Sequence, residues 1–576
     1  MKSMNRFSFN PTNLDIPRSL FDRSCDRFMS MQSAKLNVIY CDEMLPGDSV
    51  TMKTTSFIRM SKPVLPSMDP LYCDVFYFFV PMRLIWNNYK QFFGENDSTA
   101  WTRATDKVLP ALDATSIASM LSIGAYKSGC LLDQLGIHLG DYNPDTATVY
   151  GGKTPLDALE GITTLPIRAY ECIANEWFRD ENYEAPYVFS KGDAGTYDEK
   201  VGGYIHGVNH NFVHIDGLYH VNALHDYFTS ALPAPQKGPD IRPLGEGFGA
   251  LKVVTGEVHT DVDSVQTDGL YMKKRAGGYP TGSAALLFGN NTGAVSSSSA
   301  STTYNAEAGV VPTNLWANLP VDVFASVNQI RYSFALQRFL EKSARGGSRY
   351  KEVVRAHFGV TGSDSSMMIP EYVGGERFML NMDTILTTAD TPTGTTGEYA
   401  GYSKTFQNLP QWSFSSTEHG YLLGLCCIRP KMTYHQGIPR MFTRKDQLDF
   451  YWPSFANLGE QPILKKEIYA ANPASGDNDG VFGYNEAYCE YRTKPSELVG
   501  ALRPESEDFI HGYTFARSFI SQSAATAVNA RDLTPDIVGQ NLAVVDGTQF
   551  ISHFHFDAKW RRPMPVYSIP GLVDHH

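Results

Sequence analysis

A long apolar stretch lies between Leu71 and Pro81, with the sequence LYCDVFYFFVP. Its apolar side chains stand at both odd and even positions, whereas a strand with one solvated face alternates apolar with polar residues. Proline has no N–H to donate to a β-ladder, so Pro81 ends the segment. The pattern therefore predicts a strand that is covered by protein on both of its faces.

Helical spacing of apolar residues marks three segments, over residues 84–93, about 322–342 and 350–358. Each is followed by glycine, which readily adopts the left-handed conformation of a helix C-terminus. The apolar positions that define the first two segments are Leu84, Ile85, Tyr89, Phe92 and Phe93, then Val323, Val327, Ile330 and Phe334. The glycines are Gly94, Gly346, Gly347 and Gly359.

Short runs with the period of a β-strand are more frequent. Over residues 549–556, Phe550, Phe554 and Phe556 alternate with polar His553 and His555, as expected for a half-buried strand. Residues 49–60, 421–428 and 488–492 also read as strands. The chain is therefore predicted to be mainly β, with a few short helices in the connections.

One segment differs in character, from about residue 240 to residue 312. It is rich in Gly, Ser, Thr and Ala and includes NNTGAVSSSSASTTYNAEAG from Asn290. Such a composition buries little apolar surface, so we expect an exposed excursion or a disordered loop. A flexible linker between two domains is the alternative. Val253, Val254, Val258 and Tyr271 allow local strands within it.

The composition agrees with a well-packed protein that makes little overall use of charge. Of the 576 residues, 42% are hydrophobic and 12% aromatic, and the formal net charge is -12. A surface that wraps nucleic acid throughout would need many more Lys and Arg, so DNA is expected to meet a local patch at most. The eight cysteines are scattered without a C-x-x-C pair and are expected to be reduced and mostly buried. The apolar runs are too short for a membrane helix, so we expect no membrane insertion.

Several long blocks, spread over almost the whole chain, resemble the major capsid proteins of the Microviridae, in particular the gokushovirus-like branch. Within them, Val327 stands where that family usually has isoleucine. The blocks are CDEMLPGDSV from Cys41, PSMDPLYCDVFYFFVPMRLIWNNYKQFFGE from Pro66, LPIRAYECIANEWFRD from Leu165, HDYFTSALPAPQKG from His225, VNQIRYSF from Val327, EKSARGGSRYKEVVRAHFGVT from Glu341, FANLGEQPILKKEIY from Phe455, YRTKPS from Tyr491 and RPMPVYSIPGLVDHH from Arg562.

The resemblance implies an eight-stranded antiparallel jelly roll of the viral capsid type, with long loop insertions. Residues 1–576 would form one elaborated domain, with 240–312 as a surface insertion that protrudes at the three-fold axes and meets the host. Copies of the chain would close a small icosahedral shell around single-stranded DNA, in a virion assembled in the bacterial cytoplasm. The other implied partners are a small basic DNA-packaging protein, scaffolding and DNA pilot proteins, and the bacterial host surface. No cofactor is implied.

Two clusters of basic residues are candidates for contact with the packaged DNA. Between residues 331 and 355 there are seven basic residues and two acidic ones, and a smaller cluster surrounds Trp560. Such patches bind phosphates without regard to base sequence, and Tyr350 could add base stacking. The alternative is that these side chains pair with carboxylates across subunit contacts or solvate a helix face. The candidates are Arg338, Lys342, Arg345, Arg349, Lys351, Arg355, Lys559, Arg561 and Arg562.

No catalytic or metal-binding motif stands out. His206, His210 and His214 have the spacing of metal ligands on a helix, but Gly207 and Gly217 argue against a helix there. The chain contains no G-x-S-x-G, H-E-x-x-H, P-loop or strand-linked G-x-G-x-x-G motif. A β-rich carbohydrate-binding protein or glycoside hydrolase remains the alternative, because paired carboxylates cannot be located from sequence.

Overall fold

The structure is a computed structural model, and the chain divides into two compact units that are described separately. The larger unit comprises Met1–Lys237 and Lys342–His576, and the smaller one comprises Gly238–Glu341. The residues that the structure describes are 17–64, 67–95, 107–112, 129–137, 142–143, 148–149, 161–186, 190–193, 218–239, 253–255, 272–274, 286–288, 295–297, 310–312, 315–317, 327–361, 367–382, 386, 388, 403–474, 476–503, 514–542 and 548–567.

The first sheet of the larger unit is antiparallel and has four strand positions. β20 (Phe550–Arg562) and β4 (Ser49–Met60) pair with each other in its middle. β1 (Ser19–Asp22) and β2 (Cys25–Met31) follow one another along the other side of β20. β15 (Ser403–Asn408) and β16 (Trp412–Ser415) follow one another along the side of β4 that faces away from β20. β20 buries every second side chain, as the alternation over 549–556 predicts, and so does β4.

The second sheet is also antiparallel, and its two central strands are buried on both faces. Its order is β14-β5-β17-β3. In β5 and β17, residues of both parities are buried, which confirms the prediction made from LYCDVFYFFVP. The bounds are β3 (Asn37–Met44), β5 (Leu71–Pro81), β14 (Glu371–Met379) and β17 (Gly420–Pro430).

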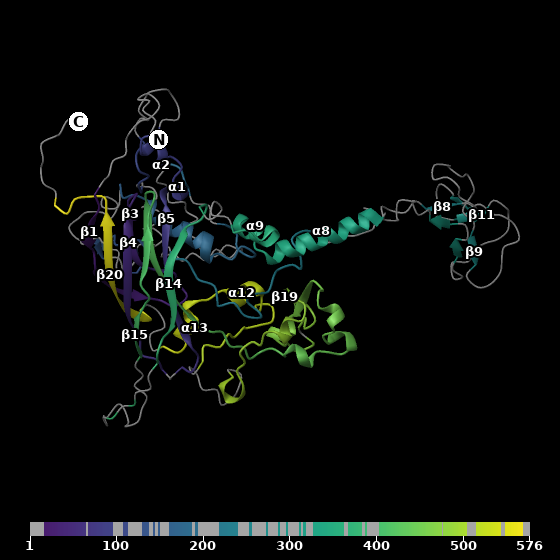
Figure 1. Cartoon of the computed structure of the whole chain (residues 1–576). Helices are drawn as coiled ribbons and strands as arrows, with labels where there is room; N and C mark the ends of the chain where they lie inside the picture. Colours follow the sequence, from purple (N-terminus) through teal and green to yellow (C-terminus); the bar gives the residue numbers. More distant parts are fainter. Residues whose placement is uncertain are drawn as a thin grey trace, which may run out of the picture. The chain divides into compact units, whose positions relative to one another are not determined.

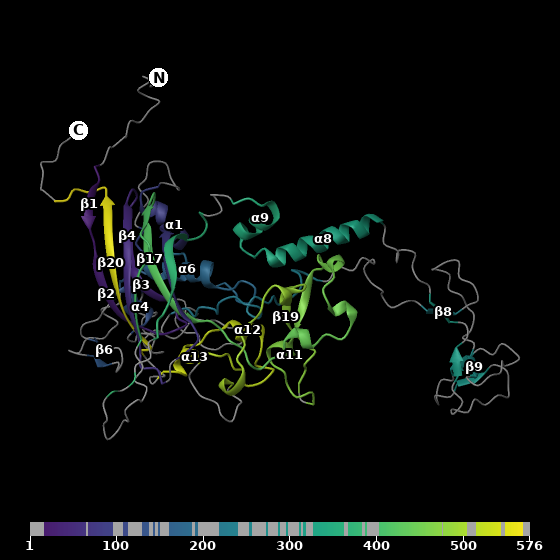
Figure 2. The same cartoon turned by 60° about the horizontal axis from the view of Figure 1, so that its bottom comes forward.

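Packing on the two faces of the second sheet explains this double burial. One face packs on the first sheet, where Val75 and Leu422 share a core with Phe554 and Trp560. The opposite face carries Phe78 and Leu423, which pack on a helical layer formed mainly by α6 (Leu165–Ile173) and α4 (Leu131–Leu135). Figure 1 shows the strands of both sheets running alongside each other, and α6 is labelled beside them in Figure 2.

The remaining elements are short. In the larger unit they are α1 (Met82–Ile85), α2 (Tyr89–Phe92), β6 (Tyr142–Asn143), β7 (Thr148–Val149), η1 (Ala174–Phe178), α9 (Tyr350–Phe358), η4 (Arg440–Phe442), η5 (Gln447–Asp449), η6 (Pro453–Phe455), β18 (Glu460–Leu464), α11 (Lys465–Ile468), β19 (Val481–Glu486), η7 (Cys489–Tyr491), η8 (Gly500–Leu502), α12 (Ala527–Arg531) and α13 (Pro535–Gly539). The protein is thus mainly β, with antiparallel sheets and few helices.

The smaller unit consists of paired short strands followed by a helix. Val253 and Val254 lie in one of these strands, as the sequence allowed, whereas Val258 and Tyr271 lie outside the described residues. The three-fold protrusion of 240–312 and the single domain over 1–576 stay predictions. The elements are β8 (Val253–Thr255), β9 (Met272–Lys274), β10 (Leu286–Phe288), β11 (Val295–Ser297), β12 (Val310–Pro312), β13 (Leu315–Ala317) and α8 (Val327–Arg345), whose last residues belong to the larger unit.

Three predicted elements differ from the structure. The strand predicted over 488–492 is the 3-10 helix η7, because Tyr488 adopts the left-handed φ of 60° and the N–H of Tyr491 turns back to its carbonyl oxygen. The helix predicted over 84–93 is divided into α1 and α2 by the extended backbone of Trp86. The helix predicted over 322–342 covers Val327–Arg345, and 322–326 lie outside the described residues. The helix over 350–358 is confirmed, with Gly359 as its left-handed cap.

The cysteines agree with the expectation of reduced thiols. All eight are free, and Cys73, Cys130, Cys172, Cys426 and Cys427 are buried. In the part of the chain that the structure describes, no helix is long and apolar enough to span a membrane.

One charged residue lies inside the doubly buried sheet. Asp74 of β5 is almost fully buried and faces Arg429 of β17 and Arg377 of β14. Arg429 Nε donates to Asp74 Oδ2 at 3.0 Å, and Arg429 Nη1 donates to the carbonyl oxygen of Asn222 at 3.1 Å. The Arg429 side chain is 12% exposed, whereas that of Arg377 is 49% exposed. Arg429 therefore depends on Asp74 for its only ion pair among the described residues.

We expect Asp74→Ala to lower the free energy of unfolding by ~3–5 kcal/mol, because it leaves Arg429 charged, buried and without its partner. Arg377→Ala removes the half-exposed partner instead and is expected to cost about 0–1 kcal/mol. Urea unfolding of the purified protein measures both. Equal losses for the two variants would contradict this account of the sheet.

Candidate assembly and nucleic-acid surfaces

Arg349, at the start of α9, is held by several acceptors of the same chain. Its Nη1 lies 3.1 Å from Glu181 Oε2, and its Nε lies 3.5 Å from Glu176 Oε2. Its Nη2 donates to the carbonyl oxygens of Asn175 and Arg179, both at 3.1 Å. These contacts join α9 to η1, so the charge of Arg349 is already compensated.

The other five predicted residues of this cluster divide into two groups. Arg345 forms an ion pair with the buried carboxylate of Glu460. Arg338, Lys342 and Arg355 are exposed, and Lys351 is half-buried. Lys351 and Arg355 line a pocket of about 590 Å³ together with Trp177 and Tyr350. The cluster is therefore partly committed to ion pairs within the subunit.

The C-terminal cluster on β20 divides in the same way. Arg562 Nε lies 3.3 Å from the buried Asp48 Oδ2, and its guanidinium lies 4.4 Å from the centre of the Trp560 ring. Lys559 and Arg561 point to the exposed face of the first sheet. Only these two of the three candidates are thus presented to a partner on that face.

Sheet pairing brings three further cations to the same face, which sequence reasoning missed. Lys53 and Arg59 are exposed residues of β4, and Lys404 of β15 lies directly opposite Arg59. These residues are far apart in the sequence, so only the strand order could have revealed them. Three aspartates accompany the five cations on this face: Asp22, Asp26 and Asp557.

The histidine candidates do not form a metal site in the described residues. His206, His210 and His214 lie outside them, and His220 is buried. Among the residues that the structure describes, no group of three His, Cys, Asp or Glu side chains could hold a metal ion.

A second surface has the opposite chemistry and lies on the loops between β17 and β18. Large apolar side chains are exposed there, and the exposed charged residues between residues 441 and 458 are Lys445, Asp446 and Asp449. We call it the apolar loop patch, and it consists of Met441, Phe442, Leu448, Phe450, Tyr451, Trp452 and Leu458.

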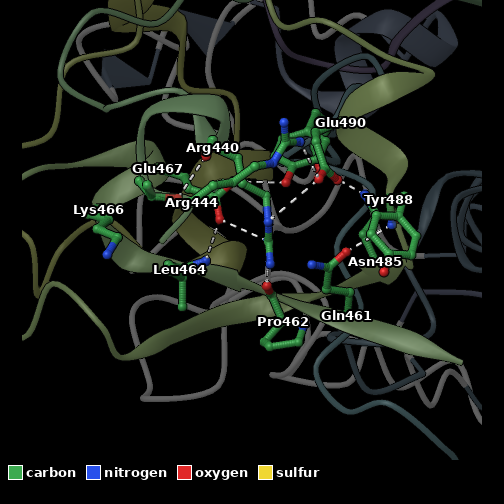
Figure 3. A network of polar contacts seen from close by, with 12 residues as sticks. Arg440, Arg444, Gln461, Pro462, Leu464, Lys466, Glu467, Asn485, Tyr488 and Glu490 are labelled. Carbon is green, nitrogen blue, oxygen red and sulfur yellow. Dashed lines mark hydrogen bonds and ion pairs between the residues drawn. The ribbon is translucent and has the colours of Figure 1, made fainter. Parts of the chain in front are cut away.

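Arg440 and Arg444, in the same loop segment as the apolar loop patch, belong to a network of buried ion pairs that Figure 3 shows. Arg440 Nη1 donates to Glu467 Oε1 at 3.1 Å and to the carbonyl oxygen of Pro462 at 2.8 Å. Arg444 Nη2 donates to Glu490 Oε1 at 3.2 Å. The side chain of Glu467 is 2% exposed, and it also accepts the hydroxyl of Tyr227 at 2.9 Å. These bonds hold irregular backbone in one conformation.

The backbone around this network is also closely packed. Gly437 lies so close to the carbonyl oxygen of Glu467 that a Cβ would have no space. The guanidinium of Arg444 stacks on the rings of Phe450 and Tyr491, at 5.2 and 4.5 Å from their centres. The subunit therefore uses buried polar bonds to hold apolar side chains in contact with water.

Comparison with known proteins agrees with a structural role. A family model described as capsid protein (F protein) matches residues 11–572. The capsid protein VP1 of Chlamydia phage 1 is 31% identical over 99% of this chain and 98% of its own length. The VP1 proteins of Bdellovibrio phage phiMH2K and Spiroplasma virus 4 are each 32% identical, over 96% and 97% of this chain and 95% and 96% of their own lengths.

Proposed function

The chain belongs to the capsid protein (F protein) family, and on this premise we propose that its shell encloses single-stranded DNA and meets it through the exposed face of the first sheet. The protein is the major capsid protein of a gokushovirus-like phage of the Microviridae, a structural subunit and not an enzyme. A carbohydrate-binding protein or glycoside hydrolase is accordingly not favoured. The observation that carries the proposal is the gathering of five cations on one sheet face.

The strand pairing supports an eight-stranded jelly roll for this subunit. Counted along the chain, the strand positions are β1/β2, β3, β4, β5, β14, β15/β16, β17 and β20. The first sheet joins positions one, eight, three and six, and the second joins two, seven, four and five. Each strand of the first half of the chain thus has a partner in the second half, which is the pairing of two Greek keys in a jelly roll.

The exposed sheet face suits a phosphate backbone better than the rest of this acidic chain does. Lys53, Arg59, Lys404, Lys559 and Arg561 stand on it within one sheet. Each phosphate that a cation neutralises releases counterions, which favours binding at moderate salt concentration. Arg338, Lys342, Lys351 and Arg355 remain candidates for the same role, whereas Arg345, Arg349 and Arg562 are already paired.

Replacing both Lys559 and Arg561 by Gln is expected to weaken the binding of free subunits to a single-stranded oligonucleotide. The slope of log K against log salt concentration is negative, and for two lost phosphate contacts it should become shallower by about 1.4. The double variant Lys90→Gln, Lys494→Gln alters two exposed cations elsewhere and should bind like the wild type. An unchanged salt slope in the sheet variant would argue against DNA contact on this face.

We further propose that the apolar loop patch is a contact between copies of the chain in the shell. Shell assembly requires each copy to bury surface against others, and permanent interfaces are rich in aromatic residues and Met and poor in charge. The patch has this composition and is held in place before assembly by the Arg440 and Arg444 bonds.

Leu448→Asp should prevent shell formation while leaving a folded subunit, because it places a charge in an interface core. Ile520→Asp is the matched control, since Ile520 is 97% exposed on another loop. Sedimentation separates particles from subunits, and thermal unfolding checks the fold. Normal particles from Leu448→Asp would remove the apolar loop patch from the assembly contacts.

The remaining proposals follow from family membership and charge. A net charge of -12 leaves most genome neutralisation to another component, which supports a small basic DNA-packaging protein as partner. An icosahedral shell, scaffolding and DNA pilot proteins, assembly in the host cytoplasm, and host contact through 240–312 at the three-fold axes are proposed on the same basis.

A further inference from the structure

The exposed face of the first sheet carries a row of four rings, aligned by strand register, in addition to its cations. We propose that this row, formed by Phe28, His553, Phe57 and Phe406, is a stacking platform for the bases of single-stranded DNA. The inference rests on the proposed contact between this face and the genome, and it adds which part of the nucleotide is bound and by which residues.

Strand register places the four rings in one line across the sheet. Phe28 of β2 is opposite His553 of β20, and His553 is opposite Phe57 of β4. Phe57 is in turn opposite Phe406 of β15. Side chains that are directly opposite in antiparallel strands lie side by side on one face. The row therefore crosses all four strand positions of the sheet.

The two outer residues of the row are largely exposed to solvent, and no packing among the described residues of the subunit accounts for large apolar side chains at these positions. Phe28 is 75% exposed and Phe406 is 63% exposed. The rings of Phe28 and His553 stack with their centres 4.3 Å apart and their planes within 7°. Flat, exposed aromatic faces of this kind are what bases stack on, whatever the base sequence.

Asp26 fixes the orientation of the histidine ring in the row. His553 Nε2 and His555 Nδ1 both donate to Asp26 Oδ1, at 2.9 and 2.8 Å. The hydrogen bond from His553, followed by that from His555, lowers the pKa of the Asp26 carboxyl. The ring of His553 is thus held against that of Phe28 before any ligand arrives.

The nearest cations lie where a backbone crossing the row would place its phosphates. Arg59 and Lys404 are opposite each other, two residues along their strands from Phe57 and Phe406. The guanidinium of Arg59 lies 5.1 Å from the centre of the Phe57 ring. Rings flanked by cations match a nucleotide, which has an aromatic base and an anionic phosphate.

The size of the row agrees with a short single-stranded segment. Four strands spaced by ~4.8 Å span roughly 14 Å, and four-stranded sheets with exposed aromatic residues elsewhere stack two or three bases. A duplex keeps its bases stacked inside, so its phosphates can reach the cations but its bases cannot reach the rings. The platform should therefore distinguish single-stranded from double-stranded DNA.

The test measures the binding of free full-length subunits to a fluorescent single-stranded oligonucleotide and to a duplex of equal length. Phe28→Leu with Phe406→Leu should weaken single-strand binding by about 5- to 150-fold for each base stack lost, and leave duplex binding unchanged. Phe358→Leu is the matched control, because Phe358 is 78% exposed on α9, away from the sheet.

The outcomes separate this inference from the proposed DNA contact. If the Lys559 and Arg561 variant loses affinity for both DNA forms while the Phe variant binds like the wild type, the face meets DNA but the platform is wrong. If neither variant matters, both proposals fail. If the Phe variant keeps full DNA affinity but no longer assembles, the row is a contact between copies and the platform is equally wrong.

A second measurement needs no variant and covers the case in which the Phe substitutions impair folding. Particles packaged with 5-iododeoxyuridine-containing DNA are irradiated, and cross-linked peptides are identified by mass spectrometry. Cross-links at Phe28 or Phe406 are expected. Cross-links confined to peptides outside β2, β4, β15 and β20, or none at all, would overturn the platform.

Discussion

The structure depends on burying the central strands β5 and β17 of the sheet β14-β5-β17-β3 on both faces. Apolar residues of both parities in β5 and β17 leave no face of these strands that could tolerate water. The first sheet covers one face and the helical layer covers the other. The first sheet, in contrast, needs cover on one side only, and its alternating strands keep the other side for polar and aromatic residues. The double burial of one sheet thus determines which sheet face can meet a partner.

The sequence was informative where a pattern is local. Apolar residues of both parities predicted the buried strand at 71–81, and strict alternation predicted β20. Tyr488 was misassigned because its left-handed conformation depends on the loops around it. The ion pairs of Arg349, a predicted DNA contact, could not be foreseen, because Glu176 and Glu181 come from a distant segment.

The cations and rings of the first sheet could not have been grouped from sequence for the same reason. Phe28, Phe57, Phe406 and His553 belong to four strands from both ends and the middle of the chain. If one strand were displaced by one residue, its ring would point into the core. The alignment of the four rings therefore depends on a strand register that cannot be predicted from the sequence. Lys53, Arg59 and Lys404 join Lys559 and Arg561 through this same register.

The apolar loop patch and the exposed face of the first sheet differ in chemistry, as do the partners that we assign to them. A neighbouring copy is held by apolar area removed from water, and the apolar loop patch supplies it on a backbone fixed by Arg440 and Arg444. A nucleic acid is held by charge and stacking, and the exposed sheet face supplies both. Both surfaces present large side chains to solvent, which suits side chains that meet a partner.

Electron cryo-microscopy of filled and empty particles tests the central claim most directly. The account predicts that the exposed face of the β1-β20-β4-β15 sheet lines the interior of the shell, and that density present only in filled particles lies against Phe28 and Phe406. It would be contradicted by a shell in which this face points outward, or in which the additional density lies only elsewhere.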